Sequence, residues 1–216
     1  MCGRFTLINW QELIVRFGVA AYDLQPRYNI APTQGIPVIV QGAKELRLFR
    51  WGLIPFWAAD ETFAARLINA RAETVLEKKS FRHCMQQKRC LIPADGFYEW
   101  KKEGNKKQPY YFSLTGGQLF AFAGLWDKWR APDGSEIFTC TIITTQANQL
   151  VAEIHQRMPV ILPPEAEAMW LDPQLRQPEV LQSLLQPYPA AMIRRAVSPL
   201  INRPNFDGPE VLNFQA

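Results

Sequence analysis

Residues 90–126 read CLIPADGFYEWKKEGNKKQPYYFSLTGGQLFAFAGLW, and no other part of the chain says as much about its architecture. Short segments rich in aromatic and β-branched residues alternate here with turn residues. This pattern predicts strands at 90–93, 97–101, 110–114 and 119–126, and a similar segment predicts another at 137–145. The lysines around the turn at 103–105 indicate a solvated hairpin end rather than a binding patch.

The segments outside this region add two further strands and several short helices. Asn9 and Glu12 have the spacing of a helix start, and Gly18 suits the end of that helix. The remaining predicted elements are strands at 37–40 and 45–51, helices at 73–88, 164–171 and 178–185, and a Pro- and Asn-rich surface segment at 196–212. Strands mixed with helices, without βαβ alternation, predict an α+β fold. We expect a single domain over residues 1–216, with an antiparallel β-barrel-like core and short flanking helices.

Composition excludes several classes of protein. The chain has 216 residues, 48% of them hydrophobic and 12% aromatic, which is typical of a folded globular protein. The net charge of +4 is compatible with a nucleic-acid groove but does not demonstrate one. There is no secretion signal and no apolar run long enough to span a membrane, so we expect a cytoplasmic protein. Four cysteines without a CxxC pair, and only two histidines, predict neither a metal site nor a metal cofactor.

Cys2 is the most reactive candidate in the chain. Removal of Met1, which is usual before a small side chain, would leave an α-amine and a thiol on neighbouring carbons of Cys2. The amine can condense with an aldehyde to an imine, and the thiol can then close a five-membered thiazolidine ring. The amine can also act as base for the thiol, as in N-terminal nucleophile hydrolases. The alternative to these two reactive roles is that Cys2 is simply a cysteine in a frayed terminus.

Three further segments place a polar residue among apolar ones. Asn69 follows two aliphatic residues and could act in a site or simply turn the chain before a helix. Glu99 stands between Tyr98 and Trp100, where aromatic neighbours would raise its pKa and suit a general acid or base, unless it lies on the solvent face of its strand. His155 precedes an apolar run and is either a proton-transfer group or a structural histidine.

Six motifs together closely resemble the SRAP family (SOS response-associated peptidase). In chain order they are MCGRF at 1–5, RYNIAPT at 27–33, WGLIP at 51–55, NARAET at 69–74, GFYEW at 96–100 and HQRMP at 155–159. They occur in the family's order and roughly its spacing. The segments 56–67 and 171–189 are less recognisable.

The resemblance implies covalent capture of abasic sites in single-stranded DNA through Cys2, in the DNA damage response. By position it implies that Asn69 holds the amino terminus, that Glu99 is the general acid/base, and that His155 assists opening of the sugar ring and formation and reversal of the Schiff base. The residues that match DNA contacts are Arg4, Asn29, Trp57, Arg71, Thr144 and Arg157, with Trp57 or a neighbour as the wedge that stacks on or separates bases. The expected partner is abasic single-stranded DNA, with no cofactor and no membrane, and we expect a monomer associated with the nucleoid at damaged or replicating DNA.

Two other functions remain open at this point. The first is an N-terminal-cysteine amidohydrolase or peptidase, which also needs a free Cys2 and would use an oxyanion hole. The second is a non-covalent single-stranded nucleic-acid binder, whose salt-sensitive binding would not depend on Cys2.

Overall fold

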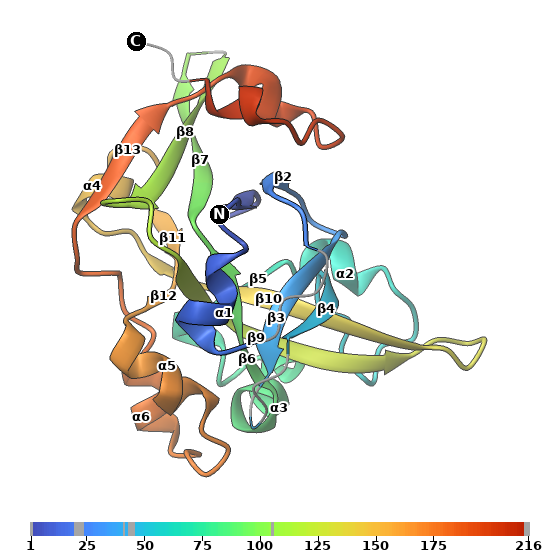
Figure 1. The fold of residues 1–216 in the computed structure, drawn as a ribbon. Helices are drawn as coiled ribbons and strands as arrows, with labels where there is room; N and C mark the ends of the chain where they lie inside the picture. The colour runs from blue at the N-terminus through green and yellow to red at the C-terminus, as the bar shows by residue number, and fades with distance from the viewer. Residues whose placement is uncertain (1, 20–23, 41, 43–45, 105, 214–216) are drawn as a thin grey trace.

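A computed structural model describes residues 2–19, 24–40, 42, 46–104 and 106–213 (Figure 1). Its strands are β1 Phe5–Leu7, β2 Arg27–Ile30, β3 Gly35–Val40, β4 Leu46–Trp51, β5 Asn69–Arg71, β6 Arg89–Ala94, β7 Gly96–Glu103, β8 Lys106–Leu114, β9 Phe120–Arg130, β10 Glu136–Gln146, β11 Arg157–Pro159, β12 Ile161–Leu162 and β13 Met192–Ala196. Its α-helices are α1 Glu12–Phe17, α2 Phe63–Arg66, α3 Lys79–Gln87, α4 Gln149–Ala152, α5 Pro164–Leu171 and α6 Pro178–Ser183. Short 3₁₀ helices lie at Ala72–Thr74, Pro199–Asn202 and Pro209–Leu212.

Five strands close into a barrel in the order β10-β4-β3-β6-β9, because β9 also pairs with β10. Four of the five pairings are antiparallel, and β4 with β10 is parallel. The long hairpin of β9 and β10 extends past the barrel to one side (Figure 1). Strand β5 adds to β10 in parallel and places Asn69 opposite Ile142. The predicted α+β fold with a barrel-like core is confirmed, and among the described strands the parallel contacts of β10 depart from an antiparallel arrangement.

A second, antiparallel sheet has the order β13-β8-β7-β1-β2 and brings the N-terminal segment to the barrel. Phe5 of β1 is fully buried, and its ring packs edge-on against Trp51 and Phe122 of the barrel at centroid distances of 5.3 and 5.7 Å. Burying an aromatic side chain of this size contributes about 1.5–3 kcal/mol. Three residues after Cys2, the chain is therefore fixed in the main core.

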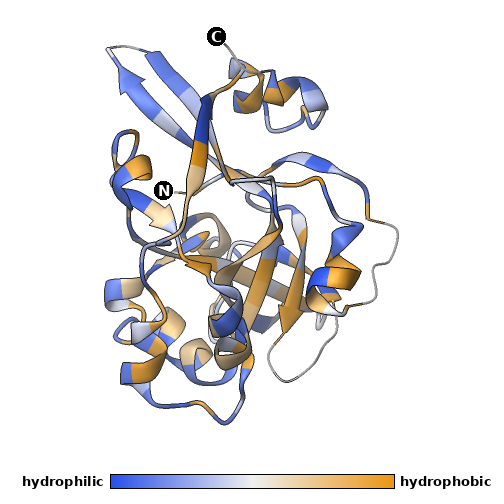
Figure 2. Cartoon of the chain, turned by 60° about the vertical axis from the view of Figure 1, so that its left-hand side comes forward, coloured by the Kyte–Doolittle hydropathy of each residue, from blue (hydrophilic) through white to orange (hydrophobic). Residues whose placement is uncertain are grey.

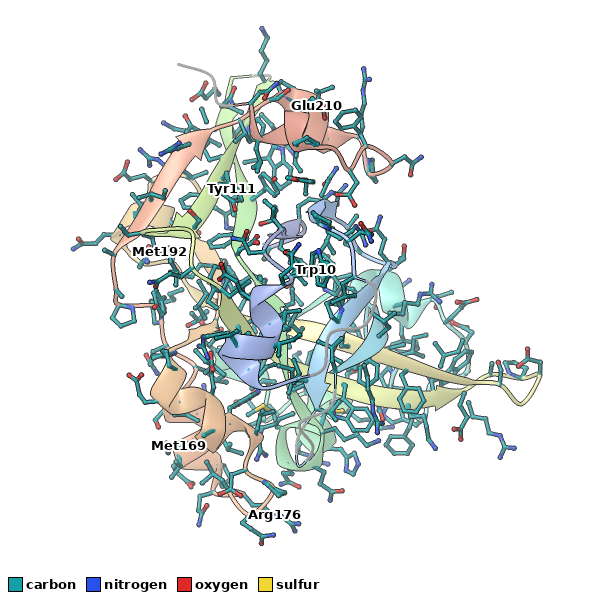
Figure 3. The ribbon with its side chains drawn as sticks, in the orientation of Figure 1. Trp10, Tyr111, Met169, Arg176, Met192 and Glu210 are labelled. Atoms are coloured by element: carbon teal, nitrogen blue, oxygen red, sulfur yellow. The ribbon has the colours of Figure 1, made fainter. Side chains whose placement is uncertain are left out.

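The C-terminal segment covers the other face of β7 and β8. Tyr98 and Tyr111 form a small cluster with Val197, Ile201 and Val211. In Figure 3, Tyr111 lies on its strand below the tail that carries Glu210. Figure 2 shows the outer end of the β7–β8 hairpin as hydrophilic, whereas the barrel strands carry most of the hydrophobic residues. Successive side chains of a strand alternate between faces, so Glu99 shares the face of Phe97, which belongs to the main core.

Several predicted element boundaries need correction. The helix predicted at 73–88 is wrong in its first half, because Thr74 O accepts hydrogen bonds from the backbone of residues 77 and 78 in a turn before α3. The helix end at Gly18 is confirmed, with a left-handed φ of 63°. Asn9 does not cap α1, because the residue before the helix is Gln11, and the Asn9 amide donates to Gly117 O. Residues 43–45 and 105, which fall in a predicted turn, strand start and hairpin tip, lie outside the described residues.

Candidate functional site

Cys2 is held in a fully buried position just before β1. Its exposed fraction is 0%, and its Sγ lies 3.9 Å from the carbonyl oxygen of Arg4. The backbone nitrogen of Tyr98 donates to that same carbonyl at 3.1 Å, so β7 runs beside Cys2. Burial raises the pKa of the Cys2 thiol, and the nearby Glu99 carboxyl raises it further. Both effects disfavour the thiolate form of Cys2.

Asn69 contacts Cys2 directly from β5. Its Nδ2 donates a hydrogen bond of 2.8 Å to the carbonyl oxygen of Cys2. Its Oδ1 is buried and accepts no hydrogen bond from the residues that the structure describes. An amide oxygen in such a place can accept from a donor on the terminal residue itself. Because Asn69 belongs to a strand, the alternative that it turns the chain before a helix is wrong.

Glu99 lies on β7 with an exposed fraction of 2%. Burial raises the pKa of its carboxyl, and the charge of the nearby His155 partly opposes this rise. The alternative that Glu99 lies on a solvent face is wrong. A carboxyl whose pKa is raised keeps its proton to higher pH and can give it to a leaving group.

His155 follows α4 and faces Glu99 across a pocket of about 340 Å³. This pocket is lined by Glu99, Trp100, Lys102, Lys107, His155 and Asn202. The Nδ1 of His155 accepts a hydrogen bond of 3.0 Å from the backbone nitrogen of Arg157, and it lies 3.1 Å from the carbonyl oxygen of the same residue. These two contacts with the backbone of Arg157 hold the imidazole ring at Nδ1.

The four predicted catalytic residues come together in the structure. Asn69 donates a hydrogen bond to the carbonyl oxygen of Cys2. The Glu99 carboxyl is close enough to raise the pKa of the Cys2 thiol, and His155 is close enough to lower the pKa of Glu99. The four residues come from segments far apart in the sequence: the N-terminal segment pairs with β7 in one sheet, and β5 and β11 both pair with β10 in the other.

Positive charges adjoin this centre. A second pocket of about 420 Å³ shares Trp100, Lys102 and His155 with the first and adds Arg71 and Arg157. Arg4 is half-buried, with Nη1 bonded to the carbonyl oxygen of Gly3 at 2.9 Å. Its Nε is buried and bonds to no described residue. All three predicted DNA-binding arginines therefore lie at or near the centre.

Two predicted DNA contacts are placed differently. Asn29 is fully buried, and its Nδ2 donates to the carbonyl oxygens of Ile201, Arg203 and Phe206 at 2.8–3.3 Å, which ties β2 to the C-terminal segment. Thr144 is also fully buried, and its carbonyl oxygen accepts from Arg157 at 2.6 Å. Asn29 thus holds the tail, and Thr144 supports an arginine. The structure brings neither side chain to the surface.

Trp57 lies in the loop after β4 and is 36% exposed. Its ring packs against Phe63, and the ammonium of Lys79 lies 4.5 Å from its centroid. It lines neither of the two pockets described above. Its neighbour Phe56 is 56% exposed. The loop presents two aromatic rings to solvent, and the wedge role of Trp57 stays a prediction.

Sequence reasoning missed some residues of the site. Lys102 and Lys107 lie directly opposite each other on β7 and β8, and both line the pocket of Glu99. The interpretation of this hairpin end as merely solvated therefore overlooked two ammonium groups beside a carboxyl. The sequence carried no such signal, because Lys102 lies one residue past the strand predicted at 97–101, and its odd spacing from Glu99 is not that of residues sharing a strand face.

The described part of the chain holds no group of three or more His, Cys, Asp or Glu side chains placed to bind a metal ion. Within the same ranges, no helix has the length and hydropathy that crossing a membrane requires. The reactive groups of this centre are the Cys2 thiol, the buried Glu99 carboxyl and the His155 imidazole, with cationic side chains at the rim.

Comparison with known proteins places this geometry in context. The family model described as SOS response associated peptidase (SRAP) matches residues 1–204. The abasic site processing protein YoqW of Bacillus subtilis is 49% identical over 221 residues, covering 98% of this chain and 99% of that one. YoaM of the same organism, also named an abasic site processing protein, is 47% identical over 224 residues and covers 100% and 99%. A crystal structure of a protein from Bacteroides thetaiotaomicron superposes with a TM-score of 0.90 at 32% identity over the full length of both chains.

Proposed function

The chain belongs to the SOS response associated peptidase (SRAP) family, and we propose that it processes abasic sites by capturing them covalently in single-stranded DNA through Cys2. Relatives named abasic site processing proteins support the substrate class. The observation that carries the proposal is the position of Cys2, bonded through its carbonyl to Asn69 and lying beside the buried Glu99. The reactive form begins at Cys2, after removal of Met1.

The proposed reaction joins one sugar to one residue. The ring-opened abasic sugar carries an aldehyde, and the amine of Cys2 adds to its carbon. The resulting carbinolamine loses water to give the imine, and the Cys2 sulfur then adds to the imine carbon while its proton passes to nitrogen. The product is a thiazolidine, and one water molecule is released. The sequence of steps needs no oxidant and no cofactor.

Each active-site residue has a place in this scheme. Glu99, with its raised pKa, supplies the proton that the departing hydroxyl takes, and it recovers a proton when the amine loses one. His155, held at Nδ1 by the backbone of Arg157, assists opening of the sugar ring. Asn69 accepts a hydrogen bond from the Cys2 amine at its otherwise unbonded Oδ1. Holding the nucleophile in this way replaces an encounter in solution by a reaction within one complex.

The positive rim suits the DNA backbone. Arg4 and Arg157 each have a buried Nε that donates to no acceptor among the described residues. Such a donor favours an acceptor such as a phosphate oxygen. Arg71, Lys102 and Lys107 add charge along the same side. Single strands fit better than duplex, because Trp57 and Phe56 can stack on exposed bases, worth about 1–3 kcal/mol per base.

Burial beside Glu99 disfavours the thiolate of Cys2, and this supports aldehyde capture over an amidohydrolase. A cysteine hydrolase attacks with its thiolate, whereas the aldehyde reaction starts at the amine and uses the thiol only for ring closure. Turnover of a peptide amide in the absence of DNA would reverse this preference.

The proposal is tested with a protein whose N-terminus is processed to Cys2. It should form a species stable to denaturing electrophoresis with a single strand that carries one abasic site. Cys2→Ala should form none, and neither should wild-type protein with a tetrahydrofuran site, which lacks the aldehyde. A stable species formed equally by Cys2→Ala, or with the tetrahydrofuran strand, would refute covalent capture through Cys2.

A further inference from the structure

Glu73 forms an ion pair with Arg157 at the edge of the cationic rim. Its Oε1 lies 2.6 Å from Nη1 of Arg157, and the two side chains are 44% and 18% exposed. Glu73 belongs to the 3₁₀ helix that follows β5. The chemistry described above makes no use of this carboxylate.

Arg157 does not need Glu73 to hold its orientation. Its Nη2 donates to the carbonyl oxygen of Thr144 at 2.6 Å and reaches Oγ1 of the same residue at 3.3 Å. Its backbone pairs β11 with β10. Glu73 therefore occupies the Nη1 side of a guanidinium that is already fixed, and this is a side from which a phosphate oxygen would bind.

The carboxylate remains charged in this setting. Its hydrogen bond from Arg157 holds the pKa of Glu73 below its usual range, and the charges of Arg157 and Arg71 act in the same direction. Glu73 also borders a neighbouring pocket of about 300 Å³ lined with the amides of Gln146, Gln182 and Gln186. A strand that leaves the pocket of Arg157 on this side must pass a fixed negative charge.

We propose that Glu73 is a specificity-determining residue that competes with DNA phosphates for Arg157 and so weakens non-covalent binding of intact single strands. Retention of DNA then depends on the bond formed at Cys2, and undamaged strands are released. This inference rests on the function proposed above. Specificity of this kind comes from weakening the wrong complex rather than from strengthening the right one.

Binding of an undamaged fluorescent oligonucleotide tests the inference. Glu73→Gln should bind it about 3- to 10-fold more tightly than wild type, because the ion pair that occupies Nη1 of Arg157 disappears and a phosphate oxygen can take its place. The matched control is Glu77→Gln, which removes the same charge from an exposed residue four positions away. In an Arg157→Gln background, the Glu73 substitution should change the Kd less than twofold.

Salt dependence gives a second readout. If Arg157 gains a phosphate in Glu73→Gln, the slope of log Kd against log salt should steepen by about 0.7, the value for one further phosphate neutralised on a single strand. Unchanged or weaker binding, equal tightening in Glu77→Gln, or tightening that persists without Arg157 would each overturn the inference.

The same preparations separate this inference from the proposed function. Adduct formation with abasic DNA is measured alongside the Kd for the intact strand. Adducts without the expected Kd change would refute the role of Glu73 alone, whereas absence of adducts from wild type would refute capture through Cys2. Absence of any binding to the intact strand, by wild type and by Glu73→Gln, would also overturn the role of Glu73.

Discussion

The hydrogen bond between Asn69 and Cys2 should control how fast the protein captures an abasic site. Asn69→Ala removes the donor that reaches the Cys2 carbonyl at 2.8 Å, and it also removes the buried Oδ1 that would receive the terminal amine. The segment before β1 would then be held mainly by Phe5. We therefore expect the amine and thiol of Cys2 to spend less time in a reactive position.

The size of the expected rate loss in Asn69→Ala follows from the burial of this hydrogen bond. Removing one partner of a buried hydrogen bond costs about 1–3 kcal/mol, because the other partner stays desolvated. If that free energy holds the terminus in its reactive position, the capture rate should fall about 5- to 150-fold. Global stability should change modestly, because each kcal/mol shifts the Tm of a protein of this size by about 2–4 °C.

The assay is single-turnover adduct formation at saturating abasic DNA, followed on denaturing gels, with Tm measured on the same samples. Asn9→Ala is the matched control, because it also removes a side-chain amide that donates to a backbone carbonyl, that of Gly117. It should lower stability slightly and leave the capture rate unchanged. A rate for Asn69→Ala within twofold of wild type, or an equal loss in Asn9→Ala, would refute the reasoning.

Three further predictions concern charge, packing and the tail. Burial raises the pKa of Glu99, so the folded wild-type protein binds the Glu99 proton more tightly than the unfolded chain does. The Tm of wild type should therefore fall relative to that of Glu99→Gln as the pH rises above about 4.3. Parallel curves of Tm against pH would contradict this. Gly96→Ala would place Cβ 2.2 Å from the Tyr111 ring and should cost about 1–3 kcal/mol in chemical denaturation, whereas Gly35→Ala, with open space around it, should cost far less. Asn29→Ala should speed proteolysis of the C-terminal segment but leave the salt slope of DNA binding unchanged, and a shallower slope would instead indicate a phosphate contact.

The strands of the barrel could be predicted from the sequence because each carries its own local signal. The runs around Ile92, Phe122 and Ile142 are apolar, β-branched or aromatic, and turn residues bound them. The short strands β1, β2, β5 and β13 could not, because three to five residues give little periodicity and owe their conformation to the strands beside them. The parallel pairing of β10 with β4 and β5 is likewise a tertiary property.

The centre of the site was predictable for a different reason. Cys2 stands out because it directly follows Met1. The residues Asn69, Glu99 and His155 stand out as polar residues among apolar neighbours, and the motifs resembling SRAP proteins linked all four. Motif matching does not report burial, however. It could not show that Asn29 and Thr144 lie under the surface, where they support the tail and an arginine.

The ion pair between Glu73 and Arg157 shows the same limit. The two residues lie 84 positions apart, and each stands in a motif of its own. Only the pairing of β5 and β11 with the same strand, β10, brings these motifs together. The sequence therefore shows Glu73 and Arg157 only as two charged residues in separate motifs. It does not show that Glu73 pairs with Arg157 and can compete with a phosphate for it.

The central claim is that a mature Cys2 forms the bond with its own amine and thiol, and the intact mass of the adduct tests it most directly. The account predicts a product whose mass equals the protein without Met1 plus the abasic strand, minus one water. Protein that keeps Met1 should form no such product. An adduct on protein that retains Met1, or one that Cys2→Ala still forms, would contradict the account.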